Sequence, residues 1–63
     1  EILDMIRRLP VGYRTVFNLY AIEGKSHKEI AAALGIKPDT SASQYKRART
    51  MLAQMIKDYK RQI

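Results

Sequence analysis

A glycine between two segments of helical periodicity is the feature that most constrains the fold of this chain. Ser26 and Glu29 have the spacing of a capping box, which predicts the start of a helix. An apolar stripe at helical spacing follows, at Ile30, Ala31 and Leu34. Gly35 is predicted to end this helix, because glycine enters a left-handed C-terminal conformation without a clash of a Cβ atom.

A second, basic helix is predicted from Pro38 to about residue 60. The fixed φ angle and missing N–H of proline cost nothing in the first turn of a helix. At about 1.5 Å per residue this helix is roughly 35 Å long, so we expect its end, from Lys57 on, to project or fray. A small-residue helix, a short turn containing glycine and a basic helix together are typical of a DNA-binding helix-turn-helix.

Two shorter helices are predicted before this motif, over residues 1–8 and 11–22. Pro10 separates them, since a residue before proline avoids the α region, and Gly24 ends the second. The expected inward side chains of these two helices are Ile2, Leu3, Ile6, Leu9, Tyr13, Val16, Phe17 and Tyr20. The expected fold is therefore all-α, a four-helix domain containing a helix-turn-helix, of the winged-helix-like DNA-binding type but without a wing.

The composition fits a small domain with a polyanionic partner. The chain has 63 residues, a net charge of +6 and no cysteine, which excludes disulfides and thiolate metal sites. No apolar run approaches the roughly 20 residues needed to cross a bilayer, so no membrane partner is expected. We find no catalytic triad, metal-ligand cluster or phosphate-binding glycine loop in the sequence, and therefore expect no enzyme, cofactor, metal or small-molecule substrate. Residues 37–63 carry seven basic and two acidic groups, which is the charge distribution expected for a domain that binds a polyanion such as nucleic acid.

The apolar line of the fourth helix predicts which of its faces points inward. That line consists of Tyr45, Ala48, Leu52, Met55 or Ile56, Tyr59 and Ile63. The opposite face then holds Asp39, Ala42, Ser43, Lys46 and Arg47. Because a recognition helix enters the major groove with its N-terminal half nearest the bases, Ser43, Lys46 and Arg47 are the expected contacts to base edges or nearby phosphates. In this arrangement Arg47 can pair with guanine, and Ala42 can lie against a thymine methyl group.

Further contacts are expected along the DNA backbone. Thr40 and Ser26 lie near helix N-termini, where hydroxyls and amides can bind phosphate oxygens. Arg49 is expected at the flank, where it reaches a phosphate or pairs with Glu29. The third helix would cross the backbone at its start, which holds Lys25, His27 and Lys28. We expect His27 to be a surface side chain rather than a ligand or a base.

The motifs of residues 9–53 together match one family. They are Leu9–Pro10, Arg14, Val16–Phe17, Leu19, Glu23–Gly24, Ser26, Glu29–Ile30–Ala31, Leu34–Gly35–Ile36, Thr40, Arg47–Ala48–Arg49 and Leu52. In this combination the segment resembles region 4, the C-terminal promoter-binding part of bacterial RNA polymerase sigma factors, and most closely that of the extracytoplasmic-function group.

The resemblance implies a function in a bacterial, cytoplasmic protein. Region 4 binds the promoter −35 element in the major groove through its last helix, and docks on the flap of the polymerase β subunit. In many members an anti-sigma factor masks it. By motif position, the DNA contacts would be Ala42, Ser43, Lys46 and Arg47. The flap-binding surface would come from the first two helices and the late part of the fourth.

Four positions depart from the family pattern. Ser41 stands where valine is usual, Ala42 where lysine or arginine is usual, and Gln44 where arginine is frequent. Lys37 lacks the side-chain oxygen of a helix cap. These departures predict looser packing near the start of the fourth helix and fewer phosphate contacts there.

Two other functions remain open on the residues alone. One is the output helix-turn-helix of a response-regulator-type activator, which would dimerise on palindromic DNA. The other is a protein-docking module without DNA contact, which would use Tyr59, Ile63 and the first two helices. The segment Leu9–Pro10 with Arg14–Thr15–Val16–Phe17 favours the sigma interpretation. The chain begins at Glu1 rather than Met, so residues 1–63 are expected to form one domain of a longer protein.

Overall fold

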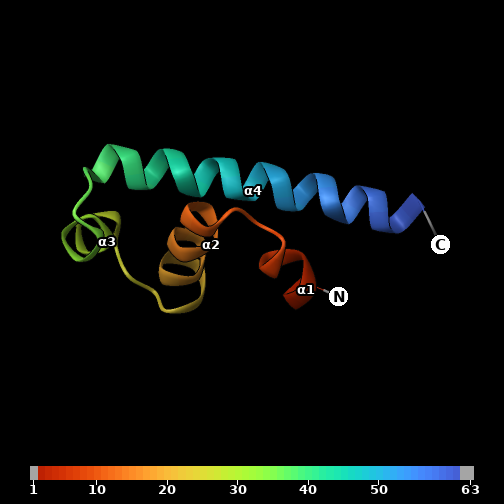
Figure 1. The fold of residues 1–63 in the computed structure, drawn as a ribbon, viewed down its shortest axis with the longest axis horizontal. Helices are drawn as coiled ribbons and strands as arrows, with labels where there is room; N and C mark the ends of the chain where they lie inside the picture. The colour runs from red at the N-terminus through yellow and green to blue at the C-terminus, as the bar shows by residue number, and fades with distance from the viewer. Residues whose placement is uncertain (1, 62–63) are drawn as a thin grey trace.

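A computed structural model describes residues 2–61, all of whose regular elements are helices (Figure 1). In chain order they are α1 (Ile2–Arg7), α2 (Val11–Phe17), a π-helical turn η1 (Asn18–Ile22), α3 (His27–Leu34) and α4 (Pro38–Arg61). The all-α, helix-turn-helix prediction is confirmed. None of the described helices is long and apolar enough to cross a membrane.

The 24-residue helix α4 is the spine of the molecule. Helices α1, α2 and α3 all lie along one side of it, with α3 near its N-terminal end, α2 near its middle and α1 further along (Figure 1). The described chain is accordingly elongated, with extents of 41 × 18 × 16 Å. The C-terminal end of α4 projects beyond α1, as its length predicted, and stays helical to Arg61.

Both ends of α3 are closed by the residues that the sequence indicated. The Ser26 hydroxyl accepts a hydrogen bond from the Glu29 backbone N–H at 3.1 Å, and the Glu29 carboxylate accepts one from the Ser26 N–H at 2.9 Å. Gly35 has φ of +70°, a left-handed conformation that costs a residue with a Cβ atom about 1–2 kcal/mol. Its N–H and that of Ile36 both bind the Ala31 carbonyl, so the end of α3 is satisfied before α4 begins.

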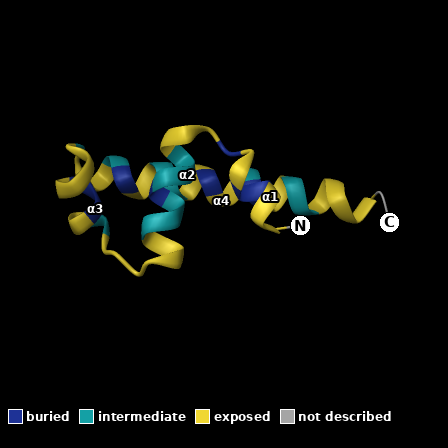
Figure 2. Cartoon of the chain, turned by 60° about the horizontal axis from the view of Figure 1, so that its bottom comes forward, coloured by how far each residue is buried: buried dark blue, intermediate teal, exposed yellow. Residues whose placement is uncertain are grey.

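The core is a thin layer between α4 and the three shorter helices (Figure 2). Its buried apolar residues are Met5, Ile6, Leu9, Val16, Ile30, Ala31, Ala48 and Leu52. Ala48 has no exposed surface, and its small side chain lets α2 approach α4 closely. Phe17, the expected core aromatic, is half-buried and packs against this layer together with Tyr13 and three apolar side chains of α4: Met51, Met55 and Ile56.

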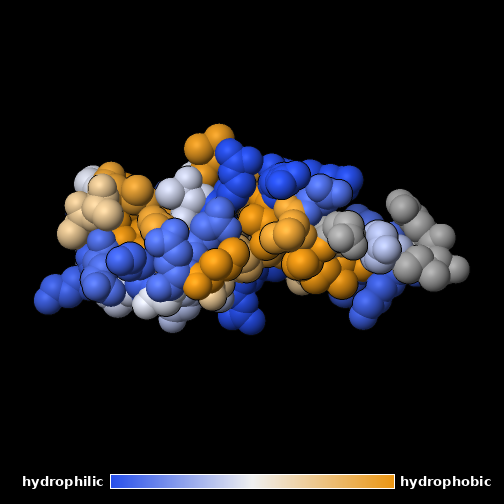
Figure 3. All heavy atoms as spheres, turned by 90° about the horizontal axis from the view of Figure 1, so that it is seen from below, coloured by the Kyte–Doolittle hydropathy of each residue, from blue (hydrophilic) through white to orange (hydrophobic). Residues whose placement is uncertain are grey.

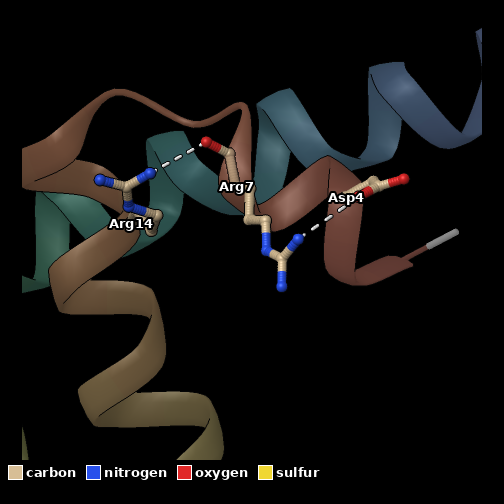
Figure 4. Close-up of polar contacts among 3 residues, drawn as sticks. All are labelled: Asp4, Arg7 and Arg14. Carbon is tan, nitrogen blue, oxygen red and sulfur yellow. Dashed lines mark hydrogen bonds and ion pairs between the residues drawn. The ribbon is translucent and has the colours of Figure 1, made fainter.

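The prediction for the inward face of α1 is partly wrong. Ile2 and Leu3 are 51% and 63% exposed, and Met5 is buried instead, beside Ile6 and Leu9. The turn into α2 determines this orientation. The Arg14 guanidinium donates a hydrogen bond to the Arg7 carbonyl at 3.0 Å and so fixes the end of α1 against α2, while Arg7 pairs with Asp4 at 3.9 Å (Figure 4).

The helix predicted over residues 11–22 widens in its second half. Beyond Phe17 the chain continues as the π-helical turn η1, whose end is marked by the hydrogen bond from the Glu23 N–H to the Asn18 carbonyl. Gly24, at φ of +74°, then ends it as predicted. Tyr20 lies in this turn with its ring 4.5 Å from that of Tyr45 in α4, so it faces α4 as predicted, but it is 38% exposed rather than buried.

The apolar stripes of α3 and α4 are confirmed in part. Leu34, the last residue of α3, is 40% exposed. Tyr59 is 46% exposed on the projecting end of α4. Ile63 lies outside the described residues.

Candidate nucleic-acid interface

The two sides of α4 separate as its periodicity predicted. Asp39, Ala42, Ser43, Lys46 and Arg47 are all exposed. On the opposite side, Ala48 and Leu52 are buried against the other helices. The first half of α4 therefore presents a continuous polar and basic face that no described element covers.

Arg49 lies at the edge of this face and makes a cation–π contact with Tyr45. Its guanidinium carbon is 5.9 Å from the centroid of the Tyr45 ring, within the range of a cation–π contact. The alternative pair with Glu29 does not form among the described residues, since that carboxylate is engaged in the cap of α3. Arg49 also lines a shallow hollow with Lys46, Thr50 and Ala53.

The residues predicted to approach phosphates lie at the starts of the two helices. Lys25 and Lys28 are exposed, and Thr40 is half-buried. The Ser26 hydroxyl accepts the Glu29 N–H, and its own hydrogen stays available to donate to a phosphate oxygen. The hydrogen bond from the Ser26 backbone N–H, with a smaller contribution from its side chain, lowers the pKa of the Glu29 carboxyl below its ordinary 4.5.

His27 is not a free surface side chain, so the sequence prediction for it is wrong. The ring is half-buried, and its Nδ1 atom lies 2.9 Å from the Ser41 hydroxyl oxygen. It stacks on Tyr20 with ring centroids 4.2 Å apart and planes 7° apart. Tyr45 closes the group, 4.5 Å from Tyr20 and 5.9 Å from His27.

Ser41 overturns the expectation of loose packing at the start of α4. It has no exposed surface and is the buried polar side chain of the described residues. A sequence signal for this was present, because Ser41 lies four and seven positions before Tyr45 and Ala48 and so extends the inward face by one turn. A hydroxyl on that face requires a partner, which the sequence did not identify.

A family described as sigma-70, region 4, matches residues 1–52. The chain belongs to this family. The match includes α1, α2, η1, α3 and the part of α4 that carries the basic face. No curated protein and no solved structure matches the chain.

Membership decides the class of function. Region 4 is a non-enzymatic helix-turn-helix module, and in sigma factors it binds the promoter −35 element. Contacts with promoter DNA and with RNA polymerase follow from membership. The family prediction made from the motifs of residues 9–53 is therefore confirmed, and the response-regulator alternative is set aside.

Proposed function

We propose that this region 4 reads its −35 element through the exposed face of the first half of α4. The observation that carries the proposal is the separation of that helix into a buried apolar side and an exposed polar side. Region 4 binds DNA, a major groove admits one helix, and the exposed face of α4 is the surface of this motif that combines basic side chains with freedom from packing.

The side chains on this face have distinct proposed roles. Arg47 pairs bidentately with a guanine, and Ala42 lies against a thymine methyl group. Ser43 and Lys46 contact base edges or the adjacent phosphates. Four residues around the face contact phosphate oxygens: Ser26, Lys28, Thr40 and Arg49. Asp39 sits in the first turn of α4, where its charge suits the positive end of the helix dipole.

The polymerase contact is proposed for the opposite end of the molecule. The exposed apolar side chains Ile2, Leu3 and Val11 belong to α1 and α2, and Tyr59 belongs to the projecting end of α4. Figure 3 shows apolar side chains gathered along the middle of the face that lies below α4. Such a surface fits the β flap, and an anti-sigma factor that covered it would keep the domain from polymerase.

The setting of the domain is also a proposal. Residues 1–63 would act as one domain of a longer bacterial sigma factor, in the cytoplasm, where promoter DNA and polymerase meet. The arrangement of all three short helices on one spine supports a single folding unit, since each of them buries its apolar side against α4.

The test is selection of bound duplexes from a random DNA pool at two salt concentrations, followed by sequencing. We expect a short motif without dyad symmetry, bound by a monomer and lost at high salt. A palindromic motif bound by a dimer would contradict the proposal. No enrichment would also count against independent promoter reading by this face, and binding to an isolated β flap would then be measured.

A further inference from the structure

Ser41 and His27 form a polar contact inside the helix-turn-helix. The Ser41 hydroxyl is fully buried in the first turn of α4, out of reach of water. Its hydrogen-bond partner is the Nδ1 atom of His27, at 2.9 Å. Among the described residues, no buried side-chain polar atom lacks a hydrogen-bond partner. A buried hydroxyl that lost this partner would bear the cost of desolvation without compensation.

The histidine ring is itself held in place from two directions. Tyr20 stacks on one face of it in nearly parallel orientation, at 4.2 Å. The Ser26 cap fixes the backbone from which it projects, because His27 is the first residue of α3. The restrained His27 side chain therefore contacts both the η1 turn, through Tyr20, and the start of α4, through Ser41.

The position of this contact relates it to DNA binding. Ser41 is followed directly by Ala42 and Ser43, which are exposed on the proposed recognition face. Hydrogen bonds within the helix also link Ser41 to the turn, since its N–H binds the Lys37 carbonyl at 3.0 Å. Ser41 therefore links the N-terminal end of α4 both to the turn and to the first residue of α3.

We propose that His27 is a positioning residue for promoter recognition, and that it acts with Ser41 as a matched pair. The pair holds the N-terminal end of α4 against α3, so that the recognition face meets the groove at a fixed depth. This inference rests on the proposed DNA-reading face of α4.

A double-mutant cycle tests the pair. The variants of the full chain are Ser41→Val, His27→Phe and the two combined, and phenylalanine keeps a ring to stack on Tyr20. Each single variant leaves one polar atom without its partner, so we expect each to weaken binding to the selected duplex about tenfold. In the double variant both polar groups are gone and the shape is largely kept, so affinity should return to within about threefold of the original.

Nuclear magnetic resonance of the imidazole nitrogens supplies a readout that packing alone would not move. In the original chain we expect the Nδ1 resonance of His27 to report a hydrogen bond, and Ser41→Ala, which adds no bulk, to shift it toward that of a free imidazole. An Nδ1 resonance unchanged by Ser41→Ala would overturn the pair, even if the bulkier variants failed to fold.

The outcomes also separate this inference from the proposed function. Losses that simply add in the double variant, or single variants that bind like the original, would overturn the pair alone. If the original chain bound no duplex, the DNA-reading proposal would fail, and with it the positioning role of His27.

Discussion

Arg47 and Ala48 are neighbours in sequence but differ completely in exposure. Arg47 is exposed, whereas Ala48 has no exposed surface. One helical step of about 100° thus separates a side chain available to DNA from one on which the packing of α2 depends. Substitutions at neighbouring positions are expected to affect different properties, DNA affinity in one case and folding in the other.

Arg47→Ala is expected to weaken binding to the selected duplex by about 1–3 kcal/mol, the range of a bidentate contact with guanine. Affinity is measured at constant salt. Arg61→Ala is the matched control, because it removes the same charge from an exposed position at the far end of α4 and should leave affinity nearly unchanged. Equal effects of the two variants would exclude a base contact by Arg47.

Ala31→Asp is expected to unfold the domain. Ala31 is 4% exposed where α3 meets α4, and an unpaired buried carboxylate costs several kcal/mol. A domain of this size has only about 3–5 kcal/mol of stability. The control is Ala32→Asp, on the exposed side of the same helix, which should keep a cooperative thermal transition. A similar melting curve for both would refute the packing of α3 on α4.

The residues whose structural roles were predicted correctly are those identified by a pattern in their immediate sequence neighbourhood. The Ser26–Glu29 cap, the Gly35 stop and the inward Ala48 each follow from a spacing or a backbone requirement. The His27–Ser41 bond joins residues 14 positions apart, and neither has a local feature that identifies the other. The predicted DNA contacts have been shown to be accessible, with Thr40 only half so, but their binding remains a prediction.

At the scale of elements, the ends of the helices were predictable and two properties of their interiors were not. Spacing and helix-breaking residues placed all four helices close to their observed bounds. The π-helical turn η1 was missed, because nothing in residues 18–22 indicates the wider hydrogen bonding that packing imposes. The face of α1 was misassigned because the turn at Leu9–Pro10 and the Arg14 bond to Arg7 orient it.

The glycines of α2 and of the turn are expected to respond oppositely to alanine. Gly35→Ala should lower the free energy of unfolding by about 1–2 kcal/mol, because its φ is +70°. Gly12 lies within α2 at an ordinary helical φ, and a Cβ there would meet only the Gln44 Oε1 atom at 3.7 Å. Gly12→Ala should therefore raise the free energy of unfolding by about 0.5–1 kcal/mol. Urea titration measures both, and a stabilising Gly35→Ala would contradict the turn geometry.

The cap of α3 predicts a contribution to acid unfolding. Because the pKa of Glu29 is lowered in the folded chain, its stabilising effect is complete above the ordinary value of 4.5 and is lost as pH falls through the lower folded value. Glu29→Gln should resemble the original chain at pH 7, since glutamine also suits the cap, and its melting temperature should fall less between pH 5 and pH 3. Glu23→Gln, in the loop before the cap, is the control, and an identical acid response of all three chains would refute the capping role.

At the scale of the whole molecule, the two ends of α4 differ in the kind of side chain that they expose. The proposed recognition face occupies its N-terminal half, and an exposed apolar side chain, Tyr59, lies on the end that projects past α1. The family match ends at residue 52, before this projection. A chain with a net charge of +6 is expected to draw much of its DNA affinity from the phosphates.

The logarithm of the binding constant is therefore expected to fall linearly with the logarithm of the salt concentration, by about 0.9 per phosphate neutralised. Lys46→Ala should reduce this slope by about one such step, if Lys46 binds a phosphate. Lys57→Ala removes the same charge from the projecting half of α4 and should leave the slope unchanged. A slope near zero for the original chain would contradict an electrostatic interface.

Because α4 is one uninterrupted helix, the directions in which side chains point at its two ends are fixed relative to each other. Each residue turns the helix by about 100° and advances it by about 1.5 Å, so an insertion or deletion near Ala53 would rotate everything beyond it relative to the groove. The number of residues between the two contact sites therefore fixes the angle between bound DNA and a partner that binds the C-terminal end of α4. Point substitutions can alter either contact without changing that angle, whereas a change in length by one residue would redirect one partner around the other.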